Sequence, residues 1–220
     1  KVKWIKSLNK INQGPVLFVG NEFFDALPIK QILKKNNIFY EKYVKWSKNK
    51  NEFEIVFKKA KNNLTNKVKK LKLNNYGNLI EYPIESLVYL KIISKKINKL
   101  NGGLLVFDYG HDEFKSIDTL QALKKHKYSN IFKNPGTADI TSHINFKIFR
   151  SILEKNNLSV EKISSQSEYL QKMGILQRAE ILSKKINFND KINMFYRIRK
   201  LLHNKEMGNI FKVMFAQKKD

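Results

Sequence analysis

The chain has 220 residues, of which 42% are hydrophobic and 12% aromatic, and this composition excludes an intrinsically disordered protein. Its net charge of +24 comes almost entirely from lysine, and lysine, asparagine and isoleucine enriched together indicate AT-rich coding more than a nucleic-acid-binding protein, which would use arginine for bidentate contacts. The absence of cysteine excludes disulfides, thiolate metal sites and cysteine nucleophiles, and no apolar run approaches the roughly 20 residues of a membrane span.

The N-terminal half begins with strand-like segments. The apolar run at residues 16–20 follows a Gly-Pro pair and predicts a buried parallel strand. Residues 38–46 and 52–58 are rich in aromatic and β-branched side chains, and a Lys/Asn-rich stretch lies between them. This pattern predicts a β-hairpin.

A helix and a second strand are predicted next. Apolar side chains recur at helical spacing over residues 84–100, with a proline before them and two glycines after them as start and stop signals. Residues 104–107 are again wholly apolar and predict another buried strand. Strand, crossover helix and strand together indicate an α/β protein with a parallel sheet.

Each of the two predicted buried strands ends in acidic residues. The stretch GNEFFDALP places Glu22 and Asp25 after the first strand, and DYGHDE follows the second. Ligands of parallel sheets bind beyond the carboxyl ends of the strands. We therefore expect Asn21 and Glu22 to lie on the same edge of the sheet as Asp108 and Tyr109.

Both stretches also have a purely structural interpretation. In the first, Asn21 or Asp25 caps a following helix, while the apolar residues of the stretch pack against the core: Phe23, Phe24 and Leu27. In the second, Gly110 makes a turn and Asp108 bonds to the backbone. The residues alone leave these alternatives open.

The C-terminal part is predicted to be mainly helical. Asn145 precedes an apolar helical pattern and could cap that helix. Helical spacing is also present in residues 168–185 and 190–203. The tail, residues 210–217, predicts a final strand that pairs antiparallel with residues 158–166.

Searches for common reaction sites are mostly negative. The nine glycines form neither G-x-G-x-x-G nor G-x-x-x-x-G-K-[ST], and no G-x-S-x-G is present. Five residues of metal-ligand type fall within 33 positions, but their spacing matches no known metal motif, which favours polar loop residues around a cleft: His111, Asp112, His126, Asp139 and His143.

Five long motifs carry a resemblance that extends from about residue 2 to residue 217: NEFFDALP, FDYGHDEFKSIDTLQALKKHK, NPGTADITSHINF, YLQKMGILQRAEIL and MGNIFKVMFAQ. In this order they resemble the MidA-like methyltransferases, a family that uses S-adenosylmethionine and includes the mitochondrial arginine methyltransferase that acts in assembly of respiratory complex I. The resemblance implies the later strands of a Rossmann-like methyltransferase sheet with a final antiparallel pair, plus the inserted hairpin and helices.

The resemblance also implies what lies outside the chain. Family members carry the glycine-rich S-adenosylmethionine loop in an N-terminal half. We expect residues 1–220 to be the C-terminal part of one class I-type methyltransferase domain that begins after this loop. The isolated chain should then be inactive and bind the cofactor weakly, and it should leave a sheet edge unpaired.

The motifs suggest roles for single residues. Asn21, Glu22 and Asp25 would follow the fourth strand of the family's sheet, where the loop approaches the reactive methyl group, with Asn21 also a cofactor contact. Glu22 would hold a guanidinium in a fork of two hydrogen bonds. His111 would accept a proton. The implied substrate-binding residues are Asp108, Tyr109, Asp139, Thr141 and His143.

The expected function is protein arginine methylation linked to complex I assembly, without a metal. The alternative is a non-catalytic assembly or chaperone-like protein that uses the same cleft. A nucleic-acid methyltransferase is disfavoured, because Asn21 is followed by Glu22 and two phenylalanines instead of N-P-P-aromatic. The expected partner is a protein, with a complex I subunit as the candidate. The expected compartment is the cytoplasm in a bacterium or the mitochondrial matrix in a eukaryote.

Overall fold

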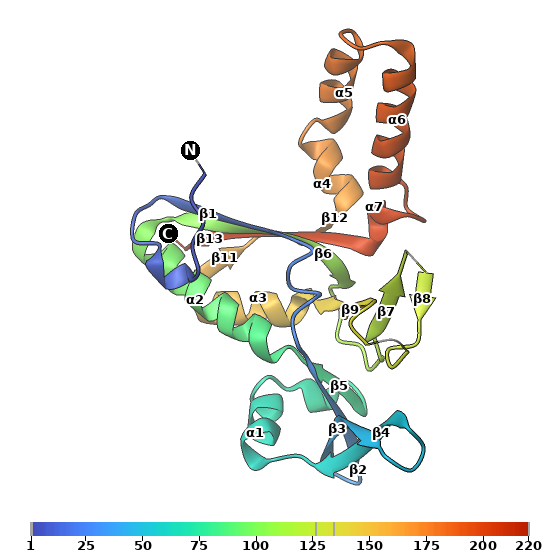
Figure 1. The fold of residues 1–220 in the computed structure, drawn as a ribbon. Helices are drawn as coiled ribbons and strands as arrows, with labels where there is room; N and C mark the ends of the chain where they lie inside the picture. The colour runs from blue at the N-terminus through green and yellow to red at the C-terminus, as the bar shows by residue number, and fades with distance from the viewer. Residues whose placement is uncertain (1, 126, 134, 220) are drawn as a thin grey trace. The chain divides into compact units, whose positions relative to one another are not determined.

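The computed structural model describes residues 2–125, 127–133 and 135–219 (Figure 1). These residues form two compact units. Unit 1 comprises Lys1–Glu22, Ile93–Gly110 and Leu153–Asp220, and unit 2 comprises Phe23–Ile92 and His111–Ile152. The fold is therefore mixed α/β, as predicted, with each unit built from strands and helices.

Unit 1 contains a mixed sheet. Strand β1 (Val16–Asn21) runs parallel to β6 (Gly102–His111), and β13 (Phe211–Lys218) runs antiparallel to β6. The short strands β11 (Leu158–Val160) and β12 (Ser164–Ser165) pair antiparallel with β13. The predicted parallel pair and the predicted final antiparallel pair are both confirmed.

Strand β1 is less buried than predicted. Its partner among the described residues is β6 alone, so β1 lies at the edge of the sheet. Side chains alternate between the two faces of a strand. Phe18 points into the core, whereas Leu17 and Val19 are 59% and 62% exposed. The expectation of a strand buried on both faces was wrong for this edge strand.

The β1–β6 pair requires a glycine at its start. Gly102 has φ +117°, and a Cβ atom there would lie 1.9 Å from the carbonyl oxygen of Val16. Only glycine accepts both this conformation and this approach. Helix α2 (Ile84–Leu100) precedes it with the predicted bounds, and the N–H of Val16 donates to the carbonyl of Asn101 at 3.0 Å.

Helices connect β12 to β13 within unit 1 (Figure 1). The predicted helix over residues 168–185 is two helices, α4 (Gln166–Lys172) and α5 (Ile175–Ser183), because Gly174 between them adopts φ +81°. Helix α6 (Phe188–Leu202) confirms the next prediction and forms a hairpin with α5. The short α7 (Met207–Ile210) leads into β13, and a 3₁₀ turn, η1 (Leu8–Lys10), lies near the N-terminus.

Unit 2 contains an antiparallel sheet in the order β4-β3-β2-β5. Strands β3 (Ile38–Ser47) and β4 (Glu52–Lys59) confirm the predicted hairpin. The hairpin is extended by β2 (Lys30–Lys35) and β5 (Leu79–Tyr82), which the sequence did not predict. Helix α1 (Asn62–Lys70) and a 3₁₀ turn, η2 (Leu73–Asn75), connect β4 to β5.

The rest of unit 2 is a small sheet followed by a helix. Strand β7 (Gln121–Lys124) pairs antiparallel with β8 (Lys127–Ser129) and β9 (Asp139–Thr141). Strand β10 (Ile144–Asn145) leads into α3 (Phe146–Lys155). The side chain of Asn145 accepts from the N–H of Ile148 at 3.2 Å, which confirms the predicted cap. Phe146 and Phe149 of α3 are fully buried.

Candidate functional site

The carboxyl ends of β1 and β6 form the first group of candidate residues, in unit 1. Asn21 lies opposite Phe107, and the N–H of Glu22 donates to the carbonyl of Phe107 at 3.0 Å. The register confirms that Asn21 and Glu22 share a sheet edge with Asp108. Both Asn21 and Glu22 are exposed, and the amide of Asn21 donates to Glu22 Oε1 at 3.4 Å.

The backbone of Glu22 is unusual. Its φ of +47° lies in the left-handed region, where the other non-glycine residues of the described chain are all asparagine or lysine. Such a conformation costs of order 1–3 kcal/mol and persists only where surrounding contacts impose it. Here the hydrogen bond to Phe107 continues the β1–β6 ladder through Glu22 and holds it in place.

Asp108 and Tyr109 lie within β6 rather than after it. Asp108 is fully buried, and its carboxylate accepts from the N–H of Tyr109 at 2.9 Å, as the structural interpretation predicted. The Tyr109 ring lies 4.1 Å from that of Phe211. Gly110 is a strand residue and makes no turn, because β6 continues to His111.

The remainder of GNEFFDALP belongs to unit 2 and is not followed by a helix. The chain passes through bends directly into β2, so the expected caps at Asn21 and Asp25 were wrong. Phe24 is 3% exposed and packs edge-to-face on Phe149 at 5.1 Å, whereas Phe23 is 40% exposed. Asp25 is 4% exposed, and its backbone carbonyl accepts from the N–H of Ser142 at 3.0 Å.

Unit 2 brings two predicted histidines together. His111 and His143 line one cavity of about 40 Å³ with Glu81 and Lys115. Burial lowers the pKa of both imidazoles, and the negative charge of Glu81 partly offsets this. The pKa of His143 is lowered further by the neighbouring His111. Both are therefore neutral near pH 7.

A hydrogen bond defines the tautomer of His111. Its Nδ1 lies 2.7 Å from the backbone carbonyl oxygen of Glu113. A carbonyl only accepts hydrogen bonds, so Nδ1 carries the proton. In the neutral imidazole the lone pair then resides on Nε2, which is the atom able to accept a proton.

A second, larger cavity adjoins the first. It has a volume of about 330 Å³ and is lined by Asp25 and Thr141 among others, and it shares Ile29 and Ser142 with the histidine cavity. The hydroxyl of Thr141 accepts from Gln121 Nε2 at 3.3 Å. Asp139, at the start of β9, is exposed and lines neither cavity.

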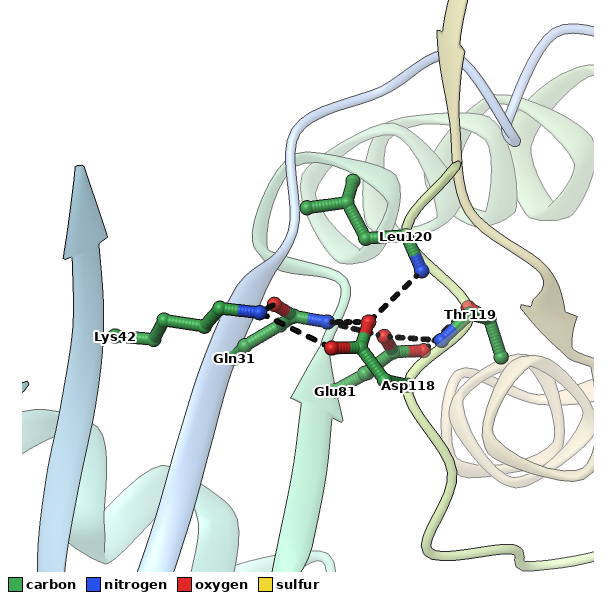
Figure 2. A network of polar contacts seen from close by, with 6 residues as sticks. All are labelled: Gln31, Lys42, Glu81, Asp118, Thr119 and Leu120. Carbon is green, nitrogen blue, oxygen red and sulfur yellow. Dashed lines mark hydrogen bonds and ion pairs between the residues drawn. The ribbon is translucent and has the colours of Figure 1, made fainter. Parts of the chain in front are cut away.

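Figure 2 shows a polar network whose Glu81 lines the first cavity and whose Gln31 and Lys42 line the second. Gln31 Nε2 donates to Glu81 Oε1 at 2.7 Å and to Asp118 Oδ1 at 2.6 Å. Lys42 Nζ donates to Gln31 Oε1 at 2.6 Å and pairs with Asp118 Oδ2 at 3.0 Å. Burial raises the pKa of Asp118, but the hydrogen bonds from Gln31 and Lys42 outweigh it, so the pKa is lowered overall.

The network continues from Glu81 to His143. Thr119 donates its N–H to Glu81 Oε1 at 3.0 Å and its hydroxyl to Glu81 Oε2 at 2.5 Å. The same hydroxyl accepts from the N–H of His143 at 2.9 Å. The sequence did not predict Glu81 or its partners, and the available signal was the acid in the short apolar segment of β5.

Two other classes of site find no support in the described chain. Within residues 2–125, 127–133 and 135–219, no three His, Cys, Asp or Glu side chains are grouped so as to hold a metal ion. His126, one of the five ligand-type residues, lies outside the described residues. No described helix is both long enough and apolar enough to cross a membrane.

The chain is similar to known proteins over most of its length. Residues 1–164 match the family model described as "Putative S-adenosyl-L-methionine-dependent methyltransferase". The protein arginine methyltransferase NDUFAF7 homolog of Caenorhabditis elegans mitochondria is 33% identical over 181 residues, and human mitochondrial protein arginine methyltransferase NDUFAF7 is 27% identical over 186 residues. These matches cover 80% and 84% of this chain but 42% and 41% of the relatives.

Two crystal structures from Burkholderia thailandensis share the fold. One, bound to S-adenosyl-homocysteine, superposes with a TM-score of 0.78 at 20% identity and covers 98% of this chain and 56% of that one. The other has a TM-score of 0.81 at 20% identity, with 98% and 58% covered. The chain therefore belongs to the MidA-like family of S-adenosylmethionine-dependent methyltransferases.

Proposed function

We propose that this chain is the C-terminal part of an S-adenosylmethionine-dependent protein arginine methyltransferase. Membership of the family and similarity to proteins named as arginine methyltransferases support this function. The observation that carries it is Glu22, an exposed carboxylate held in a strained backbone conformation at the carboxyl end of a parallel strand. Strain at such a position is typical of functional residues.

Glu22 has the chemistry to bind arginine. A carboxylate accepts two N–H donors of a guanidinium in a planar fork and fixes its orientation. This arrangement leaves one guanidinium nitrogen to react, and orientation alone supplies much of the rate enhancement in such transfers. Asn21, whose amide contacts Glu22, would help to orient that carboxylate and would also contact the cofactor.

His111 has the chemistry to receive the proton that the nitrogen loses. The Nδ1–H bond to Glu113 leaves the lone pair on Nε2, and the lowered pKa keeps that lone pair unprotonated at neutral pH. A guanidinium nitrogen loses a proton when it is methylated, and Nε2 of His111 would be able to accept that proton. His143 lines the smaller cavity and Thr141 the larger, and we propose that both contact the substrate, as do Asp108, Tyr109 and Asp139. Asp25, which lines the larger cavity, is proposed as a further catalytic residue.

The described residues fit one side of a cofactor site. S-adenosylmethionine, when bound, supplies the methyl sulfonium from which the methyl group is transferred. Asn21 and Glu22 present polar side chains at the sheet edge, but no glycine-rich turn accompanies them in the sequence. We therefore propose that a preceding N-terminal half, placed along the unpaired edge of β1, completes the class I-type domain to which both units belong.

Calorimetry with the 220-residue chain tests whether the cofactor site is divided between this chain and a preceding half. The chain alone should not bind S-adenosylmethionine in the micromolar range, because the glycine-rich part of the site lies elsewhere. Micromolar binding would show that the described residues suffice and would contradict the division.

We infer the partner and the compartment from the named relatives. We propose a protein substrate, with a respiratory complex I subunit as the candidate. The named eukaryotic relatives are mitochondrial, which supports the matrix in a eukaryote and, by analogy, the cytoplasm in a bacterium.

The decisive experiment is Glu22→Gln in a full-length version of the protein. Loss of the negative charge should lower methyl transfer to an arginine peptide by at least about 100-fold, because the guanidinium is no longer oriented, while cofactor binding stays measurable. Glu85→Gln, at an exposed acid in the first turn of α2, is the matched control and should leave turnover unchanged. Unchanged turnover in Glu22→Gln would refute the assignment, and peptide binding without turnover in the unaltered protein would favour a chaperone-like function.

A further inference from the structure

The histidine cavity contains a carboxylate that forms no hydrogen bond with the imidazole of His111 or His143. Glu81, at β5, lines the same cavity as His111 and His143. Its two oxygens accept three hydrogen bonds, from Gln31 Nε2 and from the N–H and hydroxyl of Thr119. These bonds fix the carboxylate in the cavity that both imidazoles line.

The Thr119 hydroxyl connects Glu81 to His143 by two hydrogen bonds. The Thr119 hydroxyl donates to Glu81 at 2.5 Å and accepts from the backbone N–H of His143 at 2.9 Å. A hydroxyl that both donates and accepts in this way has a fixed orientation. The backbone of His143 is thereby tied to β5 through a single side chain.

The network also anchors Glu81 to the hairpin of unit 2. Gln31 of β2 bridges Glu81 and Asp118, and Lys42 of β3 bonds to both Gln31 and Asp118 (Figure 2). The Lys42 side chain is 14% exposed, and its Nζ pairs with Asp118 Oδ2 at 3.0 Å. Glu81 therefore remains as the carboxylate of the network that faces the histidine cavity.

We propose that Glu81 is the positioning residue of the histidine pair: it holds His143 through Thr119, and it stabilises the positive charge that His111 gains on accepting a proton. The second role rests on the proposed function. When Nε2 of His111 binds the proton, a neutral ring becomes a cation in a partly buried cavity, and a fixed negative charge nearby offsets the cost. Lys115 opposes a positive charge on His111, while Glu113 adds to the effect of Glu81.

Imidazole titration by NMR on the 220-residue chain tests the electrostatic part. In Glu81→Gln, the pKa of both His111 and His143 should fall, by about 0.3 to 0.7 units for the loss of one nearby charge screened by water. The matched control is Glu113→Gln, which should lower the pKa of His111 and leave His143 unchanged, because Glu113 acts on His111 alone. If Glu81→Gln leaves the pKa of His111 unchanged, the proposal is overturned.

Thr119→Val tests the positioning part and keeps the carboxylate. The amide hydrogen of His143 should exchange at least about 10-fold faster once its acceptor is lost, a change of about 1.4 kcal/mol in local opening. The imidazole pKa values should stay near those of the unaltered chain. An unchanged exchange rate would overturn this part, even if Glu81→Gln did not fold. Neither measurement needs cofactor or substrate, so failure of methyl transfer would refute the proposed function and leave these results standing.

Discussion

The two carboxylates at the candidate sites, Glu22 in unit 1 and Glu81 in unit 2, are held in opposite ways. Glu22 is exposed, accepts one long bond from its neighbour Asn21, and is placed by its own strained backbone. Glu81 accepts three hydrogen bonds of 2.5 to 3.0 Å and is placed by Gln31 and Thr119, which come from distant parts of the chain. A carboxylate that binds and releases a ligand needs unused acceptor sites, whereas one that orders its surroundings needs to be saturated.

The largest expected effect concerns packing beside Glu22. Phe24→Ala should lower the free energy of unfolding by about 3–5 kcal/mol, because it removes a buried ring that packs on Phe149 and lines the histidine cavity. Urea denaturation of the 220-residue chain measures the loss. Phe23→Ala, at a ring 40% exposed, should cost clearly less. Equal losses would mean that both aromatics of GNEFFDALP are structural to the same degree.

A smaller effect of opposite sign is expected at Glu22 itself. Glycine adopts φ +47° without steric cost, so Glu22→Gly should raise the free energy of unfolding by up to about 1 kcal/mol while removing the carboxylate that we propose binds the guanidinium. The control is Glu85→Gly in α2, where glycine should destabilise by about 1 kcal/mol. If Glu22→Gly also destabilises the chain, the backbone strain is absent and the contrast with Glu81 is weaker.

The smallest effect is the pH dependence contributed by the histidine cavity. Both imidazoles have a lowered pKa in the folded chain, so unfolded histidine binds protons at higher pH. The contribution of the two histidines to the free energy of unfolding is complete above a pH of about 6.5. It is lost as the pH falls from that value towards their pKa in the folded chain. The double variant His111→Gln, His143→Gln should therefore lose less stability between pH 7 and 5.

The control for this titration is Asp118→Asn. The pKa of Asp118 is lowered in the fold, so its contribution is present above the ordinary value of about 3.9 and is lost below it. This variant should flatten the stability profile only in the acid range. Parallel profiles for the unaltered chain and the histidine variant between pH 7 and 5 would contradict the buried, neutral state of the pair.

The sequence predicted the parts of the molecule that depend on local pattern. The β1–β6 pair, the hairpin of unit 2, α2 and the cap at Asn145 were confirmed, because apolar periodicity and cap residues act over a few positions. The grouping of His111 with His143 was also expected, although from a family resemblance. The proposed roles of these histidines and of Glu22 remain predictions.

The sequence did not predict contacts between distant segments. Gln31 Nε2 donates to Glu81 and to Asp118, which lie 50 and 87 positions away along the chain. No local sequence pattern predicts such a network. The end of β6 was misplaced for a similar reason. Asp108 reads as a loop acid, but pairing of β6 with β13 keeps it in the strand.

The exposed edge of β1 favours association between chains, and the lysine-rich surface opposes it. A strand edge with Leu17 and Val19 exposed is a template for association with another chain. A net charge of +24 opposes that association through repulsion between like-charged molecules. Because salt shortens the range of this repulsion, the solubility of the chain should depend on ionic strength. The lysines, which say little about function, thus help to keep the chain from associating along the exposed edge of β1.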